Sequence, residues 1–397
     1  MKLRPEEKAM LNGEHGKAVQ KAMQILDTLG RVYGAESMLP VNSVQISGVS
    51  YANLGEAGLA WLAEMAAGGS RVRTLTTLNP AGMDIENWRT LGIDADFARK
   101  QMRVLEVFES MGVVSTCSCT PYLFGNLPRF GEHIAWAESS AVCYANSVLG
   151  ARSNREGGPS ALASALTGVT PAYGYHLDAQ RKPTVSVLVK ADVQETWRFG
   201  ALGKAIGDKL QGRQQVAYIQ GIAQASLEEL KSFCASFATY GGAALFHMQG
   251  ITPEAACFQA PSETLEITES DLKRANTELN SASADEVDFV SLGCPHLSLR
   301  EVARIAELLA GKKVKKEFWI TTSRPVKGMA DRAGYSALIE AAGAKFAVDT
   351  CCVVAPIRGR FNAMLSDSAK ACYYAQAKNK FKTRLLPFDE VVKESLK

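Results

Sequence analysis

The sequence has no long apolar run. Nowhere does it approach the roughly 18 consecutive apolar residues that a membrane-spanning helix needs. The opening residues, Met1 to Lys8, are charged and no apolar segment follows them, so we expect no secretory signal and a cytoplasmic protein. The formal net charge is only +3 and the lysines are scattered, which predicts that the chain binds neither a membrane nor nucleic acid.

Several motifs of cofactor-binding enzymes are also missing. There is no G-x-G-x-x-G and no P-loop, which disfavours a nicotinamide enzyme and a nucleoside triphosphatase. The nine cysteines include no C-x-x-C pair, so a zinc ribbon is poorly supported, and their odd number and wide spacing disfavour a disulfide framework. We therefore expect reduced thiols or metal ligands.

What the chain does contain is an alternation of strand and helix patterns, which predicts parallel sheets with helices on their faces. With 397 residues and ~150 residues per domain, two or three domains are expected. We place them at residues 1–168, 169–286 and 287–397. The expected strands are 43–47, 71–77, 113–116, 184–190, 215–219, 243–248, 287–292, 318–322 and 344–348. The expected helices include 17–33, 52–67, 96–111, 226–240, 299–309 and 326–342, and the tail after residue 355 is expected to hold only one helical run, 366–378.

The stretch from residue 115 to 168 has an unusual pattern. From residue 132 to 149, small and polar residues alternate with apolar ones, whereas a surface helix would separate them onto two faces. We interpret 132–149 as a helix that is buried among polar partners or lines a site, because a buried polar group without a partner costs about 1–3 kcal/mol. Within it, Glu138 and His133 are candidates for proton relay.

Three cysteines, Cys119, Cys294 and Cys351, each follow a predicted strand. Open α/β sheets bind ligands at the carboxyl ends of their strands, so these thiols are expected at a site. Three thiolates can hold an iron–sulfur cluster and leave one iron open as a Lewis acid. Two alternatives stay open: Cys294 and His296 as a nucleophile and its base, or thiols that are only part of the core. The cysteines that we expect in the core are Cys143, Cys234, Cys257 and Cys372.

Two turns are candidates for anion binding. Residues 154–158, Asn-Arg-Glu-Gly-Gly, form a charged and glycine-bent turn at an expected helix start, which suits an anion. Ser323, Arg324 and Lys327 open a second helix. In both cases the alternative is a plain salt-bridged turn.

Several segments resemble the large subunit of the aconitase X family. They are SGVSYANLGEAG, CTPYLFGN, GEHIAWAESSAVCYANSVLGARSNREGGPSALASALTG, LGCPHLS, ITTSRPVK and DTC. The resemblance runs over essentially the whole chain, and the long central motif is specific. It implies an aconitase-like α/β fold of three α/β/α units with mostly parallel sheets around a cluster site. The members that the chain resembles are dehydratases, which act on 5-phosphomevalonate or on cis-3-hydroxy-L-proline.

By the same resemblance, the chain would be a hydro-lyase that removes water from a β-hydroxy acid. Cys119, Cys294 and Cys351 would hold the iron–sulfur cluster, which we expect to be [4Fe-4S] with one open iron. Cys117 and Cys352 depart from the family pattern and compete for the ligand role. A separate small subunit would carry the swivelling domain that closes the active site.

The resemblance also implies a small anionic substrate. The two cationic turns favour 5-phosphomevalonate over cis-3-hydroxy-L-proline. The competing classes are a cluster that serves only structure or electron transfer, and a non-catalytic binding module. The residues that we expect to bind the substrate are Asn79, Asn154, Arg155, Glu156, Ser323, Arg324 and Lys327.

Overall fold

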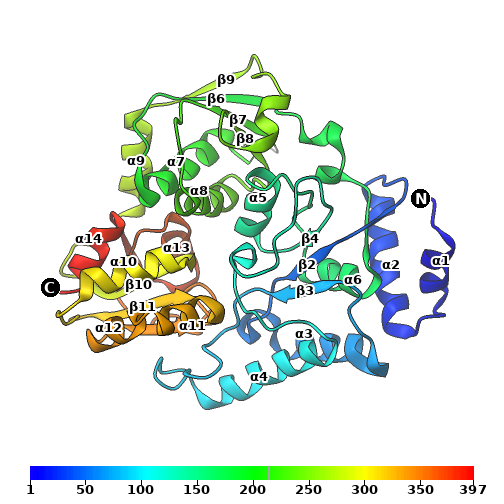
Figure 1. Cartoon of the computed structure of the whole chain (residues 1–397), viewed down its shortest axis with the longest axis horizontal. Helices are drawn as coiled ribbons and strands as arrows, with labels where there is room; N and C mark the ends of the chain where they lie inside the picture. Colours follow the sequence, from blue (N-terminus) through cyan, green and yellow to red (C-terminus); the bar gives the residue numbers. More distant parts are fainter. Residues whose placement is uncertain (213–214) are drawn as a thin grey trace.

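The computed structural model describes residues 1–212 and 215–397, and parallel sheets organise it (Figure 1). Within these residues the strands form three parallel sheets and one short antiparallel pair. We call the three sheets with their helices the first, middle and last unit. The predicted α/β class with mostly parallel sheets is confirmed. No helix in these two ranges is long and apolar enough to cross a membrane.

The first unit has a three-stranded sheet in the order β3-β2-β4, with β2 in the centre. Its helices pack in pairs, α2 with α6 and α3 with α4, around an apolar core. The strands are β2 (Ser43–Ile46), β3 (Leu75–Leu78) and β4 (Ala135–Trp136), with β1 (Met38–Pro40) pairing with β5 (Val169–Pro171) beside them. The helices are α1 (Pro5–Asn12), α2 (Lys17–Val32), α3 (Tyr51–Ala66), α4 (Ala95–Ser110), α5 (Ser139–Ser147) and α6 (Gly158–Thr167).

The middle unit has a four-stranded sheet in the order β8-β7-β6-β9. Its helices α7 and α8 lie very close together, because α7 presents glycines to α8: a Cβ on Gly203 would lie 2.8 Å from the backbone nitrogen of Phe237. The strands are β6 (Val185–Val189), β7 (Ala217–Gln220), β8 (Phe246–Met248) and β9 (Thr264–Ile267), and the helices are α7 (Glu195–Leu210), α8 (Leu227–Tyr240) and α9 (Glu269–Leu279).

The last unit has a five-stranded parallel sheet in the order β12-β11-β10-β13-β14. Its inner strands are buried on both faces, as expected of a parallel sheet that is covered by helices. The strands are β10 (Val287–Leu297), β11 (Glu317–Thr322), β12 (Lys345–Val348), β13 (Ala363–Ser366) and β14 (Lys382–Leu385). The helices are α10 (Leu299–Leu309), α11 (Arg324–Arg332), α12 (Tyr335–Ala341), α13 (Ala369–Tyr374) and α14 (Phe388–Glu394).

Four expectations about local structure were wrong. Residues 132–149 are not one helix: they contain β4 and α5, and Glu138 caps α5 by accepting a hydrogen bond from the backbone of Ala141. Residues 113–116 form only an isolated bridge to β3. Residues 326–342 are divided into α11 and α12 at Gly334, which has a φ of 78°. The tail after residue 355 holds two strands that were not expected, β13, which pairs with the distant β10, and β14, which pairs with β13.

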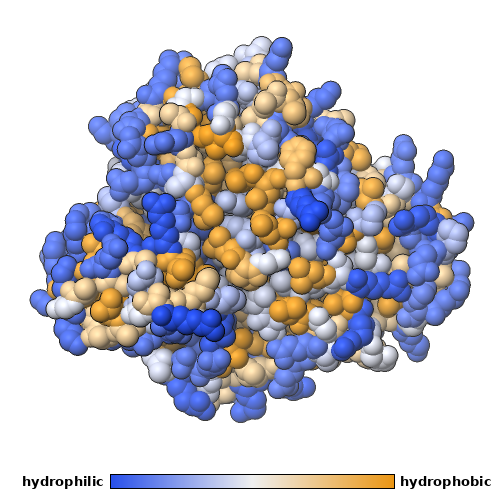
Figure 2. Space-filling model, viewed as in Figure 1, coloured by the Kyte–Doolittle hydropathy of each residue, from blue (hydrophilic) through white to orange (hydrophobic). Residues whose placement is uncertain are grey.

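The three units meet at the centre of the molecule, where α5 of the first, α8 of the middle and α13 of the last unit lie near one another (Figure 1). Helix α8 contacts both α5 and α13. On the face shown in Figure 2, apolar residues gather over this central region, while charged residues dominate the periphery. On this face, the surface over the meeting point of the units is therefore more apolar than the periphery.

Candidate functional site

Several of the sequence-predicted residues lie at the carboxyl ends of strands in two sheets. Cys119 does not, because the strand predicted before it, residues 113–116, forms only an isolated bridge. In the first unit, Asn79 follows β3 and Glu138 follows β4. In the last unit, Ser323 follows β11 and Cys351 lies three residues after β12. Cys294 differs from the prediction because it lies within β10, but the regular pairing of β10 with β11 shifts after Leu292, so the cysteine belongs to the irregular end of that strand.

One buried histidine links the three cysteine-bearing turns. The backbone N–H of His296 donates to Sγ of Cys119 over 3.2 Å. Its Nε2 lies 2.9 Å from the carbonyl oxygen of Thr350, and its Nδ1 lies 3.0 Å from Oγ of Ser118. Burial lowers the pKa of His296 to about 4, so the ring is neutral. With both ring nitrogens engaged in these contacts, His296 is not available as a base for Cys294.

One buried cation, Lys370, interacts electrostatically with the three thiols. Nζ of Lys370, near the start of α13, donates to Oε1 of Glu138 over 2.5 Å, and both side chains are buried. Burial alone would lower the pKa of Lys370, but Glu138, Cys294 and Cys119 raise it above its usual value. The ammonium group also acts on Cys351. Its positive charge therefore favours the thiolate forms of all three cysteines.

Glu138 is fully engaged in this arrangement. Its Oε2 accepts hydrogen bonds from Oγ of Ser140 and from the backbone N–H of Ala141. Burial acts to raise the pKa of Glu138, but Lys370 and these donors hold it below its usual value. The carboxylate thus serves as a helix cap and as the counter-ion of Lys370.

The cysteines differ in whether they belong to an apolar core. Cys119 and Cys351 are buried, yet they belong to none of the hydrophobic clusters formed by the described residues, and Cys294 lies only at the edge of one. Their competitors Cys117 and Cys352 lie inside such clusters. The other clustered cysteines are Cys143, Cys234 and Cys372, while Cys257 is exposed.

The three thiols fit an iron–sulfur group by their chemistry. All nine cysteines are free, as expected, and none is among the two residues left undescribed. Burial raises the pKa of Cys119, Cys294 and Cys351, while Lys370 acts in the opposite direction on each, as does the side chain of Ser368 on Cys294. Binding of iron displaces the thiol proton in any case.

A single metal ion is a poorer fit. Within residues 1–212 and 215–397, no three His, Cys, Asp or Glu side chains are close enough to hold one ion. A cluster of several irons places its cysteines around a larger body, so wider spacing of the ligands suits it.

The turn at 154–158 joins a buried carboxylate to an unpaired cation. Arg155 is exposed and makes no hydrogen bond or ion pair with any described residue. Glu156 is buried, its Oε2 accepts a hydrogen bond from Ser160, and its Oε1 has no partner among the described residues. Burial raises the pKa of Glu156. A Cβ on Gly158 would lie 2.8 Å from the carbonyl oxygen of Ser47, so only glycine lets the turn approach the end of β2.

The second cationic turn is already neutralised. Arg324 forms ion pairs with Asp349, Asp84 and Glu86. Lys327 pairs with Asp331 at 2.6 Å. Ser323 caps α11 by accepting from the backbone N–H of Val326. This turn has the salt-bridged character that was the alternative to anion binding.

The remaining candidates have different surroundings. Nδ1 of His133 lies 3.0 Å from Nδ1 of His176, and burial lowers the pKa of both rings. Asn79 has a buried Oδ1 without a partner in the described part of the chain. Asn154 donates to the carbonyl oxygen of Tyr173 and accepts from the backbone of Tyr175. Asn154 therefore holds its turn in place, whereas Asn79 has an acceptor to offer.

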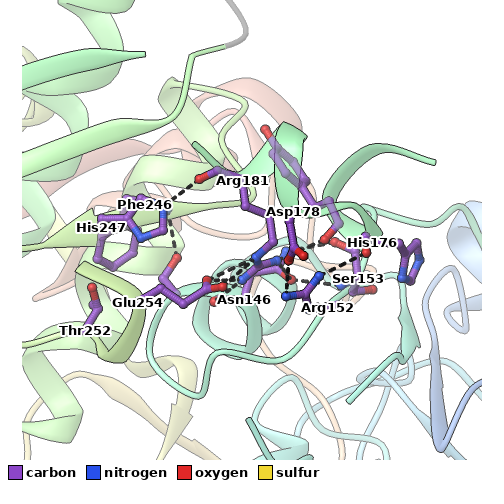
Figure 3. Close-up of polar contacts among 12 residues, drawn as sticks. Asn146, Arg152, Ser153, His176, Asp178, Arg181, Phe246, His247, Thr252 and Glu254 are labelled. Atoms are coloured by element: carbon purple, nitrogen blue, oxygen red, sulfur yellow. Dashed lines mark hydrogen bonds and ion pairs between the residues drawn. The ribbon is translucent and has the colours of Figure 1, made fainter. Parts of the chain in front are cut away.

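A buried ion pair between Arg181 and Glu254 is connected through Asn146 to Ser153, the residue before the 154–158 turn (Figure 3). Arg181 bonds to Glu254 through Nε over 3.0 Å and also reaches the backbone carbonyl oxygens of Asn146 and Tyr175. Asn146 in turn donates to the carbonyl oxygen of Ser153 and accepts from its backbone N–H, over 2.8 and 2.9 Å. The middle unit is thereby fastened to the residue that precedes the turn.

Sequence reasoning missed Lys370, Arg181 and Glu254. They lie in ordinary amphipathic or polar segments, and their ion-pair partners are 73 residues away or more. Asn146 carried a signal, because it is one of the polar residues that break the apolar pattern of 132–149.

Comparison with known proteins identifies similar chains over the whole length. Family models described as the first, second and third domains of aconitase X match residues 1–179, 183–277 and 287–397. The phosphomevalonate dehydratase large subunit of Methanothermobacter thermautotrophicus is 46% identical over 371 residues, which is 93% of this chain and 92% of that protein. That of Thermococcus kodakarensis is 44% identical and is covered completely, as is this chain.

A longer relative and a solved structure complete the comparison. The cis-3-hydroxy-L-proline dehydratase of Pseudomonas aeruginosa is 36% identical over 93% of this chain, which spans only 65% of that protein. The crystal structure of Thermococcus kodakaraensis aconitase X in its holo-form has a TM-score of 0.94 at 43% identity, with both chains covered completely. These matches confirm the resemblance drawn from the sequence motifs.

Proposed function

This chain belongs to the aconitase X family, and from that premise we propose that it is the large subunit of a dehydratase that converts (R)-5-phosphomevalonate to trans-anhydromevalonate 5-phosphate. The observation that carries the proposal is the set of three free thiols whose ionisation Lys370 favours: Cys119 and Cys351 are buried, and Cys294 is partly buried. The names of the relatives that are 44–46% identical agree with it.

Cys119, Cys294 and Cys351 are the residues that would hold the iron–sulfur cluster, which we propose to be [4Fe-4S]. When bound, the cluster supplies an open Lewis-acidic iron for a hydroxyl and a carboxylate oxygen of the substrate. Lys370 offsets part of the negative charge that three thiolates bring into a buried place, and Glu138 holds Lys370 in position.

The reaction breaks one C–H bond and one C–O bond, forms a C=C bond, and releases water. Arg155, an exposed guanidinium without a partner among the described residues, binds an anionic group of the substrate. Burial raises the pKa of Glu156, and its Oε1 has no partner among the described residues, so Glu156 is the group that we assign to proton exchange. Asn79 accepts a hydrogen bond from a substrate hydroxyl at Oδ1.

Arg324 and Lys327 are already paired with carboxylates. We therefore assign the anion-binding role to Arg155. Both carboxylate oxygens of Glu138 are engaged, one by Lys370 and the other by Ser140 and Ala141. Nδ1 of His133 lies against His176. Glu156 is the better-placed group, because one of its oxygens is without a partner among the described residues.

A partner subunit is part of the proposal. We propose a small subunit that carries the swivelling domain and docks over the cysteine turns and the 154–158 turn. Two similar proteins of matching length are named large subunits, and the Pseudomonas aeruginosa enzyme is longer than the region it shares with this chain. The central apolar region of the face in Figure 2 is suited to such a partner. We further propose that the complex works in the cytoplasm, where free thiols stay reduced.

The test is an assay of the anaerobically purified complex with 5-phosphomevalonate and, separately, cis-3-hydroxy-L-proline. The proposal expects formation of an alkene from the first substrate only, and no activity from this chain without its partner. Turnover of hydroxyproline alone would make the chain a cis-3-hydroxy-L-proline dehydratase subunit. A bound cluster without turnover of either would indicate an electron-transfer or structural role.

A further inference from the structure

His296 contacts residues from all three units. Its carbonyl oxygen accepts a hydrogen bond from Nζ of Lys231 in α8 of the middle unit, over 2.9 Å. Ser118 and Cys119 belong to the first unit, and Thr350 belongs to the last unit, as does His296 itself. Both ring nitrogens and both backbone polar groups of this single residue are thus directed to neighbours that are 54 to 178 residues away.

The hydrogen-bond partners define the state of the ring. The carbonyl oxygen of Thr350 can only accept, so Nε2 of His296 carries the proton and donates. Nδ1 then accepts, and the hydroxyl of Ser118 is its donor. This pattern leaves no ring atom for a substrate, and it requires the two turns to lie on opposite sides of the imidazole.

We propose that His296 is a positioning residue that fixes the three cysteine turns relative to one another and thereby allows the iron–sulfur cluster to bind and stay bound. The inference rests on the proposed function, because it assumes that Cys119, Cys294 and Cys351 are the ligands. The turns have no short covalent connection, so their spacing depends on contacts such as these. Cluster ligands must be held at defined positions, and the residues that orient metal ligands commonly affect metal affinity.

The experiment compares iron retention in variants of the full-length chain, in complex with its partner, after anaerobic reconstitution with iron and sulfide. His296→Ala removes both ring contacts, and we expect it to lose iron to a chelator about 10–100-fold faster than the wild type. His296→Gln keeps the ring volume in part and one amide donor for Thr350, so it should recover part of the retention. Ser118→Ala removes one contact and should act in the same direction with a smaller effect.

His247→Gln is the matched control. His247 is also fully buried, and its Nε2 also lies within hydrogen-bond distance of a backbone carbonyl, that of Arg181 at 2.7 Å, but it lies in the middle unit on β8. We expect its substitution to leave iron retention unchanged. The urea midpoint of each metal-free variant shows whether a change in retention exceeds a general loss of stability.

Each outcome has a distinct meaning. Wild-type iron retention in both His296→Ala and Ser118→Ala would overturn the role of His296 while leaving the cluster intact. Equal losses of iron in His247→Gln and His296→Gln would also overturn it, since the effect would then be general. If the wild-type complex itself binds no iron and sulfide, the proposed function fails, and the role of His296 fails with it.

Discussion

Replacing Glu254 by glutamine tests how much the buried ion pair with Arg181 contributes to the free energy of unfolding. The side chains of Arg181 and Glu254 are 1% and 9% exposed, and Nε of Arg181 lies 3.0 Å from each carboxylate oxygen. Glu254→Gln keeps the size of the side chain but leaves the guanidinium buried without a counter-ion. Breaking one partner of a buried pair costs about 3–5 kcal/mol, and we expect the lower end because the carbonyl oxygens of Asn146 and Tyr175 remain as acceptors.

The assay is urea unfolding of the full chain, with two controls. Glu266→Gln breaks the exposed pair with Lys190, whose partners are 50% and 51% exposed, and should cost less than about 1 kcal/mol. Replacing Arg181 and Glu254 together by methionine removes both charges and should restore most of the stability, because apolar replacements of buried pairs are often neutral. The reasoning is refuted if Glu254→Gln is no more destabilising than Glu266→Gln.

Two further predictions concern the site, and a third concerns the pH dependence of stability. Cys119→Ser, Cys294→Ser and Cys351→Ser should each abolish the visible absorption of the cluster while Cys372→Ser retains it; bleaching by Cys117→Ser or Cys352→Ser instead would contradict the ligand assignment. Arg155→Ala should raise KM for 5-phosphomevalonate without lowering the urea midpoint, and Arg155→Lys should recover part of the loss; an unchanged KM would exclude Arg155 as an anion ligand. Burial, aided by Glu301, raises the pKa of Asp367 to about 6 from 3.8, so the folded chain holds a proton there that the unfolded chain has lost, and stability falls as pH rises through this window. Asp367→Asn should therefore stabilise the chain more at about pH 7.5 than at about pH 4.5, measured by urea unfolding, and an equal effect at both would be contrary to that linkage.

Local patterns predicted most of the regular structure because they depend on residues near in sequence. The alternation of strand and helix was recognisable from apolar periodicity, as in α2 and α10. The prediction failed where distant partners decide the conformation. Ala135–Trp136 is a strand because β2 pairs with it, and Glu138 begins a helix after it, although the whole segment had the composition of one mixed helix.

The strands after residue 355 were also missed, because local patterns do not reveal distant partners. Residues 363–366 and 382–385 are short and carry little pattern of their own, yet they form β13, which pairs with β10, and β14, which pairs with β13. Their conformation is fixed by the free edge of a sheet whose first strand begins 76 residues earlier, at Val287. No local propensity contains that information.

The sequence by itself determined which residues are candidates, and the tertiary structure decided what surrounds them. Position after a strand selected Cys119 and Cys351, but it selected their neighbours Cys117 and Cys352 equally well. Only the packing shows that Cys117 and Cys352 lie within apolar cores, while Cys119 and Cys351 lie outside them. Cys351 and Cys352 are adjacent, and the backbone of Cys117 has a φ of 43°, so the chain turns between Cys117 and Cys119. The surroundings that each side chain meets come from other parts of the chain.

The charges of the site were likewise decided by the fold. Arg155 and Arg324 are both arginines at helix starts, and nothing local distinguishes them. The structure leaves Arg155 unpaired among the described residues and surrounds Arg324 with Asp84, Glu86 and Asp349. Two of these three carboxylates come from about 240 residues away, because the loop that follows β3 in the first unit lies against the last unit. Electrostatic environment depends on distance in space, and only the folded chain defines that distance.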